Sequence, residues 1–127
     1  MTMFNKMKAE WKAKWVAALR SGKFKQGPEG VMRSQDWDGK VNGYCCLGVL
    51  QEITAPADLE NVNYESFPSP ACLRAAGLPK YRKFTRLGNP EPAESGIVMT
   101  LAKMNDGDIG SRRSSFDEIA DFIEKNL

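Results

Sequence analysis

The chain has 127 residues, of which 42% are hydrophobic and 27% are charged, and its formal net charge is +2. These values are typical of a globular protein and exclude a chain that is disordered throughout. No apolar run reaches the roughly 18 residues of a membrane span, and the Lys-rich start lacks the apolar stretch of a signal peptide. We therefore expect one domain over residues 1–127, in the cytoplasm, without a membrane partner.

Histidine and cysteine usage narrows the possible chemistry. The chain has no histidine and three cysteines, Cys45, Cys46 and Cys72. An odd number of cysteines, two of them adjacent, suits a reducing compartment. Ser-His and Cys-His catalysis is excluded, and a structural zinc site would need a rare ligand set. We expect no metal, no cofactor and no catalytic residue.

The first predicted element is an amphipathic helix between Thr2 and Ser21, because its apolar residues recur at helical spacing. Gly22 should end this helix, since glycine takes the left-handed conformation of a C-terminal cap without steric cost. Trp11 and Trp15 are interpreted as its core face, with a partner-binding groove as the alternative.

Charge is distributed unevenly along the chain. Residues 1–25 contain seven basic residues and one acidic residue, whereas residues 104–127 contain three basic and six acidic residues. Opposite charges at the two ends favour docking of the first helix inside the fold over a nucleic-acid-binding face. A short basic run at residues 80–86 includes Tyr81 and Phe84, but one such run does not by itself predict nucleic acid as a partner.

A short antiparallel hairpin is predicted next. Residues 31–34 and 40–42 can pair across Asp36-Trp37-Asp38-Gly39, where the Asp-Gly pair supplies the turn. Both strands are short and have weak alternation of apolar and polar residues.

The run from Tyr44 to Leu50 is the most apolar and least charged stretch of the chain. Helical spacing continues through Ile53, so we expect this run to open a buried central helix with Asn42 or Tyr44 as its N-cap. Gly48 in the helix interior indicates close backbone approach by another element, such as a tryptophan of the first helix.

Cys45 and Cys46 are interpreted as core residues, because cysteine behaves as a small buried hydrophobe when no neighbour lowers its pKa. The alternative is a functional role for Cys45, whose position at a helix N-terminus could lower the thiol pKa. No histidine is present to act as its base, so an enzyme would need a carboxylate or a lysine instead.

Farther along the chain, Ser69 and Pro70 occupy the positions of an N-cap and a first helical residue, which predicts a short helix that ends at Gly77. Residues 80–94 are basic and then proline-rich, so we expect a loop with one turn or one short strand. Residues 96–104 are compatible with a helix or a strand.

The stretch Asn105-Asp106-Gly107-Asp108 is expected to turn, and it lacks most of the acidic ligands of a calcium loop. A final helix is predicted from Ser115, because Ser115 and Glu118 form a capping box ahead of an apolar face. Together the elements predict an α+β fold, in which three to five helices pack with a short antiparallel β-hairpin or small sheet around a single core.

Arg112 and Arg113 precede this final helix, whose free N–H groups and dipole favour anions. A phosphate group could bind there. The alternative, which is favoured, is a pair of loop cations that balance nearby acidic side chains.

Several blocks of sequence have a distinctive combination of residues. They are W-x3-L-x-SG-x-F in the segment from Trp15 to Gln26, YCCLGVL at residues 44–50, L-x3-ND at residues 101–106 and F-x2-IA-x2-I at residues 116–123. As a set they resemble a family of small bacteriophage proteins, from which the link that holds Arg112 and Arg113 departs by its length. The resemblance implies a phage accessory protein, for which binding to a factor of the bacterial host is the expected mode of action.

The leading hypothesis is a non-enzymatic binding protein that counters a host factor, with sequestration of a small anionic, nucleotide-like ligand as its preferred form. Polar groups of these blocks are expected to meet around Cys45, where Tyr44 could stack a base and the two arginines could hold phosphate. The candidate ligand-binding residues are Gln26, Tyr44, Cys45, Asn105, Asp106, Arg112 and Arg113.

Two other hypotheses remain open. A protein that inhibits a host protein by binding it would expose an apolar patch larger than a few hundred Å². A cysteine-dependent enzyme would use Cys45. A homo-oligomer is compatible with each hypothesis.

Overall fold

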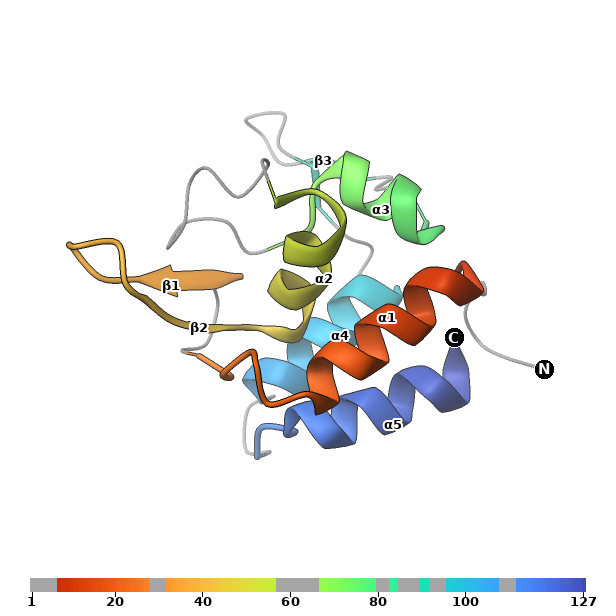
Figure 1. The fold of residues 1–127 in the computed structure, drawn as a ribbon. Coiled ribbons are helices and arrows are strands. Elements are labelled where there is room, and N and C mark those ends of the chain that lie inside the picture. Colours follow the sequence, from red (N-terminus) through yellow and green to blue (C-terminus); the bar gives the residue numbers. More distant parts are fainter. Residues whose placement is uncertain are drawn as a thin grey trace.

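Helix α2 (Cys46–Thr54) is the centre of the fold in the computed structural model (Figure 1). The structure describes residues 7–27, 32–56, 67–79, 83–84, 90–91, 96–107 and 112–127. Helices α1 (Ala9–Arg20), α3 (Pro70–Ala76) and α4 (Ile97–Asp106) contact α2, and α5 (Phe116–Asn126) packs on α1 and α4. The strands form two pairs, β1 (Arg33–Gln35) with β2 (Val41–Tyr44) and β3 (Lys83–Phe84) with β4 (Pro90–Glu91). Both strand pairs are antiparallel, so the α+β prediction is confirmed.

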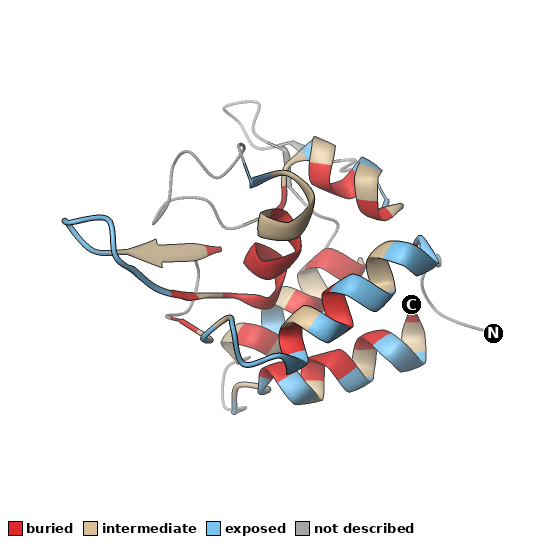
Figure 2. Cartoon of the chain, viewed as in Figure 1, coloured by how far each residue is buried: buried red, intermediate tan, exposed pale blue. Residues whose placement is uncertain are grey.

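The first two turns of α2 are buried on all sides, from Cys46 through Gln51 (Figure 2). Helices α1, α3 and α4 pack against them, which agrees with the lack of charge in this stretch. The predicted N-caps, Asn42 or Tyr44, are wrong. Strand β2 keeps the chain extended through Tyr44, and the thiol of Cys45 takes the cap position, where its Sγ accepts a hydrogen bond from Gly48 N at 3.3 Å.

Gly48 marks a close backbone approach, as predicted, but the approaching element is Met32 and not a tryptophan. A Cβ atom at position 48 would overlap the carbonyl group of Met32, the residue just before β1. The carbonyl of Met32 also accepts a hydrogen bond from Cys45 N at 3.0 Å. The start of the hairpin is therefore pressed against the N-terminal turn of α2.

Helix α1 buries one face against α2 and α5. The Trp15 side chain is fully buried, and its Nε1 donates to the carbonyl of Cys46 at 2.9 Å, while Trp11 is half-buried against the same core. The predicted core face is confirmed. Gly22 has a φ of +77° just after the helix end, as predicted, and residues 2–6 of the predicted helix lie outside the described residues.

Helices α1 and α5 lie side by side (Figure 1). A basic side chain of α1 contacts acidic side chains of α5. Arg20 pairs with Asp121 at 2.7 Å and with Glu124 at 3.2 Å. These side chains are exposed, so the pairs contribute little to stability beyond the buried apolar contacts. The predicted docking of the basic first helix within the fold is confirmed.

The helix α3 prediction is also confirmed. Ser69 accepts a hydrogen bond from Cys72 N at 3.2 Å as the N-cap, Pro70 is the first helical residue, and Gly77 ends the helix with a φ of +77°. The fully buried Gln51 of α2 holds this start in place: its Oε1 accepts from Ser69 N at 2.8 Å. Of residues 80–94, the structure describes only the paired β3 and β4.

Two helices, α4 and α5, account for most of the described residues from 96 to 127. Residues 97–106 form a helix and not a strand, and the predicted turn at Asn105 is wrong: Asn105 and Asp106 belong to the last turn of α4, with Gly107 as its C-cap. Ile97, Val98 and Leu101 are buried on one face of this helix, which explains why the segment forms a helix and not a strand. The capping box of Ser115 and Glu118 at the start of α5 is confirmed.

Candidate functional site

The predicted ligand-binding residues converge at the N-terminus of α2. The segment at Gln26 pairs with β2 through a parallel bridge to Tyr44. Gly27 N donates to the carbonyl of Tyr44 at 2.9 Å, and Tyr44 N donates to the carbonyl of Lys25 at 2.8 Å. The end of α4 reaches the same place through Asn105, so residues far apart in sequence meet here.

Asn105 is the hub of this polar cluster, and its side chain is fully buried. Its Oδ1 accepts hydrogen bonds from Cys46 N and from Gln26 Nε2, each at 3.1 Å, and its Nδ2 donates to Asp106 Oδ1 at 3.0 Å. The first N–H groups of a helix have no partner within the helix. Asn105 therefore satisfies one of these groups of α2 from a different element.

Arg113 closes the cluster on the α5 side. Its Nε donates to the carbonyl of Asn105 at 2.8 Å, and its Nη2 donates to the carbonyl of Gly27 at 2.7 Å. Gln26 Nε2 also donates to the carbonyl of Ser114 at 2.9 Å. The guanidinium thus ties the end of α4 to the segment that precedes Pro28.

Arg112 does not join the cluster. It forms a two-pronged, exposed ion pair with Glu118, with N–O distances of 2.8 and 2.7 Å. This hydrogen bond and the capping contact with Ser115 lower the pKa of Glu118 to about 2. The alternative interpretation, a loop cation that balances an acidic neighbour, is confirmed for Arg112.

Tyr44 lies half-buried at the base of the hairpin. Its ring meets the edge of Phe24 with 5.1 Å between ring centroids. Burial, followed by the charge of Glu52, raises the pKa of its phenol, and Arg33 opposes this in part. Arg33 faces Tyr44 in the strand register and pairs with Glu52 at 3.4 Å. Sequence reasoning missed Arg33 and Glu52, because the strand register brings Arg33 to Tyr44 and the packing of the hairpin on α2 brings Arg33 to Glu52.

The cluster as a whole is a tightly bonded polar network. Six predicted residues lie in or beside it: Gln26, Tyr44, Cys45, Asn105, Asp106 and Arg113. Their side-chain amides and the Arg113 guanidinium already bond to protein atoms, so a ligand would have to replace bonds that hold the fold. Across the ranges that the structure describes, no three potential metal-binding side chains lie together.

The cysteine side chains are buried. Burial raises the pKa of Cys45 from its ordinary value of 9.0 to about 11, and it also raises the pKa of Cys46 well above that ordinary value. Cys46 Sγ donates to the carbonyl of Leu101 at 3.6 Å, and Cys72 is fully buried in α3. At neutral pH these conditions favour the unreactive thiol over the nucleophilic thiolate.

We predict that none of the three thiols reacts with a thiol-specific reagent such as Ellman's reagent in the native protein at about pH 8, because a reagent must reach a thiolate. All three should react after unfolding in denaturant. The absorbance change of the released thionitrobenzoate measures this. Rapid modification of one thiol in the folded protein would contradict the prediction and favour a reactive Cys45.

The raised thiol pKa values also predict a loss of stability at alkaline pH. The unfolded chain releases the Cys45 proton above about pH 9, whereas the folded chain holds it until about pH 11. The unfolded state is therefore favoured increasingly as the pH rises through this window. The urea midpoint measured from pH 7 to 10.5 should fall less in a Cys45→Ala variant than in the wild type; equal slopes would contradict this.

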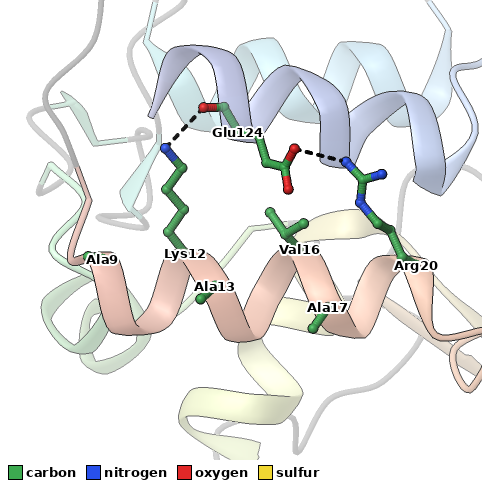
Figure 3. Close-up of a pocket in the computed structure, with 7 residues that line it drawn as sticks. All are labelled: Ala9, Lys12, Ala13, Val16, Ala17, Arg20 and Glu124. Carbon is green, nitrogen blue, oxygen red and sulfur yellow. Dashed lines mark hydrogen bonds and ion pairs between the residues drawn. The ribbon is translucent and has the colours of Figure 1, made fainter.

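A second feature is a shallow groove between α1 and α5, with a volume of about 430 Å³ (Figure 3). Its lining consists of Ala9, Lys12, Ala13, Val16, Ala17, Arg20 and Glu124. Both cations of the groove contact Glu124: Lys12 Nζ donates to its backbone carbonyl at 3.0 Å, and Arg20 pairs with its carboxylate. Sequence periodicity indicates the helix but not this groove.

Trp37 is the third feature, and sequence reasoning treated it only as a turn residue. It lies at the end of the β1–β2 hairpin, which projects away from the helices, and its side chain is fully exposed (Figures 1 and 2). The other large apolar side chain exposed in the described part of the chain, Val41, lies on the same hairpin. A tryptophan in a predicted Asp-Trp-Asp-Gly turn was the available signal.

A sequence model of DUF8296, a domain of unknown function, matches residues 7–127. The chain belongs to the DUF8296 family. No curated protein and no solved structure matches this DUF8296 chain. In the ranges that its structure describes, each helix is too short or too polar to cross a membrane. The similarity to phage proteins and the ligand-binding roles of the cluster residues stay predictions.

Proposed function

We propose that this DUF8296 protein acts by binding another protein, without catalysis, and that the β1–β2 hairpin makes the contact. The observation that carries the proposal is the full exposure of Trp37 at the tip of a projecting hairpin. Tryptophan is the side chain most enriched among residues that dominate binding energy at protein interfaces. An indole held in water on a projecting element gains most by entering a partner's pocket.

The construction of the hairpin supports this role. Gly39 N donates to the carbonyl of Asp36 at 3.0 Å, and Asp36 N donates to the carbonyl of Lys40 at 2.8 Å. Two backbone hydrogen bonds therefore close the turn. Gly39 has a φ of +87°, as a tight turn requires. A turn ordered before binding loses little conformational entropy when it docks.

The base of the hairpin is anchored as well. Met32 contacts α2 through the Cys45 hydrogen bond, and Arg33 pairs with Glu52 of α2 while both are largely buried. The polar cluster around Asn105 holds the other strand through the Gln26–Tyr44 bridge. In this proposal the predicted site residues support the hairpin, and the binding contact is made at its tip.

The small anionic ligand has weaker support. The guanidinium of Arg113 bonds to two carbonyl groups and that of Arg112 to Glu118, and Phe24 meets the Tyr44 ring. The resemblance to phage proteins makes a protein of the bacterial host the expected class of partner. Binding of a partner protein and binding of a small ligand both require no covalent chemistry, which agrees with the raised thiol pKa values.

Trp37→Ala is predicted to abolish partner binding without loss of stability. Removal of a central aromatic anchor costs about 2 kcal/mol or more of binding free energy, which is a loss of at least about thirtyfold in affinity. The exposed indole contributes little to folding, so the thermal midpoint should change by less than about 2 °C. Affinity capture from bacterial lysate compares tagged wild type with Trp37→Ala.

Lys125→Ala is the matched control, because Lys125 is exposed on α5, far from the hairpin in sequence. It should retain the partner that Trp37→Ala loses. Recovery of the same proteins by both variants, or of no stoichiometric partner by the wild type, would contradict the proposal.

A further inference from the structure

We infer that the partner protein receives Trp37 in a recess with an apolar floor and a cationic rim. The inference rests on the proposed function and specifies the chemistry of the partner at the same site. Trp37 stands between Asp36 and Asp38, and all three residues are exposed at the end of the hairpin. An indole flanked by two carboxylates matches a pocket that offers apolar contact at its base and Lys or Arg at its edge.

The charge at the tip selects among classes of macromolecule. Residues 36–40 contain two aspartates and one lysine. Nucleic acids and anionic lipids carry negatively charged phosphates, which bind Lys and Arg side chains. These phosphates would repel a carboxylate that lies beside the inserted indole. A protein surface is the class that can place cations around an apolar pocket.

Asp36 and Asp38 have different positions in the turn. Asp36 Oδ1 accepts a hydrogen bond from Asn42 Nδ2 at 2.7 Å, and its backbone atoms close the turn. Part of the Asp36 side chain therefore serves the hairpin itself. Asp38 is exposed in the turn beside Trp37, so its charge can change with little effect on the fold. Asp38 is thus the residue with which to test the rim.

The two side chains are expected to affect binding kinetics differently. A rim charge accelerates encounter and makes the association rate depend on salt, whereas a buried aromatic anchor slows dissociation. Trp37 should control how long the complex lasts, and Asp38 should control how fast it forms. Salt at about 0.5 M, where charges are screened over a few Å, should remove most of the contribution of Asp38.

A second copy of the chain is the alternative occupant. The α1–α5 groove is lined by small apolar residues and by the cations Lys12 and Arg20, so it has the apolar floor and the cationic rim that we infer for the partner. Both cations already contact Glu124, whose carboxylate would also face the acidic tip. We therefore favour a different protein.

Photo-crosslinking tests the inference directly. The probe is the full chain with p-benzoylphenylalanine in place of Lys40, which is exposed at the end of the hairpin, so that Trp37 and both aspartates are kept. It is irradiated in bacterial lysate, and the control carries the same group in place of Lys125. Two further probes combine the group at position 40 with Asp38→Lys or Asp38→Glu. Circular dichroism melting checks that all variants are folded. Parallel samples contain the purified probe alone, the probe with phosphatidylglycerol vesicles, or the probe with poly(U) RNA.

The expected result is a protein adduct from position 40 and not from position 125, mapped by mass spectrometry to apolar residues beside Lys or Arg. Asp38→Lys should lower the adduct yield about tenfold at low salt, and Asp38→Glu should leave it within about twofold. A protein adduct whose yield does not respond to Asp38→Lys would overturn the cationic rim but leave the proposed function standing.

Two other outcomes would overturn the proposed function or the inferred class of partner. If position 40 gives no protein adduct in lysate, the proposed function fails together with the inference. If the adduct forms on a second copy in the purified sample, on the lipid or on the RNA, and not on a lysate protein, the inferred partner class is wrong.

Discussion

Asn105→Ala is expected to lower the free energy of unfolding by about 3 kcal/mol and the thermal midpoint by about 10 °C. The substitution removes the Oδ1 atom that accepts from the buried Cys46 N–H and from Gln26 Nε2. A buried donor without a partner costs about 1–3 kcal/mol, and the vacated space adds to the loss. Urea unfolding followed by circular dichroism measures the change.

Asn126→Ala is the matched control for this prediction. Asn126 Nδ2 donates to the carbonyl of Phe122 at 2.9 Å, but this bond lies at the end of α5 and involves no other element. The control should cost less than about 1 kcal/mol. If both asparagine variants were equally stable, Asn105 would not be the hub of the polar cluster.

Gly48→Ala is expected to be the most damaging single substitution, with a loss of at least about 4 kcal/mol of folding free energy. A methyl group at position 48 would overlap the backbone of Met32, which cannot move without breaking its hydrogen bond to Cys45 N. Helix propensity alone predicts the opposite sign, a gain of about 0.5–1 kcal/mol from alanine in a helix interior. The sign of the change therefore decides between the two effects.

Gly22→Ala separates steric overlap from backbone strain. Gly22 has a φ of +77°, but an added Cβ would meet nothing within 4 Å. Its replacement should cost about 1 kcal/mol from the left-handed conformation alone. Measured by urea unfolding beside Gly48→Ala, it gives the reference for a glycine in open space. A Gly48→Ala protein as stable as the wild type would show that Met32 can move away from α2.

Both predictions bear on the proposed function, because the same contacts aim the hairpin. Met32 is pressed against Gly48 immediately before β1, and the Asn105 cluster holds Gln26 beside β2. Trp37 itself has no such supporting contact from the helices. Loss of partner binding in Trp37→Ala with unchanged stability would then be distinct from the loss expected when the core is damaged.

Much of the fold could be predicted from local sequence. The helical spacing in α1 and α5, the Ser69-Pro70 start and Gly77 end of α3, and the Ser115 capping box act within one or two turns of chain. Their physical basis is local, because a cap or an apolar stripe needs only its neighbours in sequence. The buried central helix after Tyr44 followed from the same kind of pattern.

The site could be predicted only in part. Its members were expected to meet around Cys45, and the structure brings six of the seven together. Their chemistry was expected to serve a ligand, yet the Asn105 and Arg113 side chains bond to other elements of the protein. A polar side chain has the same donors and acceptors in either role, so sequence alone cannot distinguish them.

The sequence by itself determined the helices α1, α3 and α5, both ends of α3, and that a buried helix follows Tyr44, because these depend on neighbours along the chain. Only the tertiary structure decided that Met32 packs on Gly48, that Asn105 completes the start of α2, and that Trp37 remains in water. Packing and burial depend on segments distant in sequence. The local sequence around a tryptophan in a turn is therefore the same whether the fold buries its side chain or leaves it exposed.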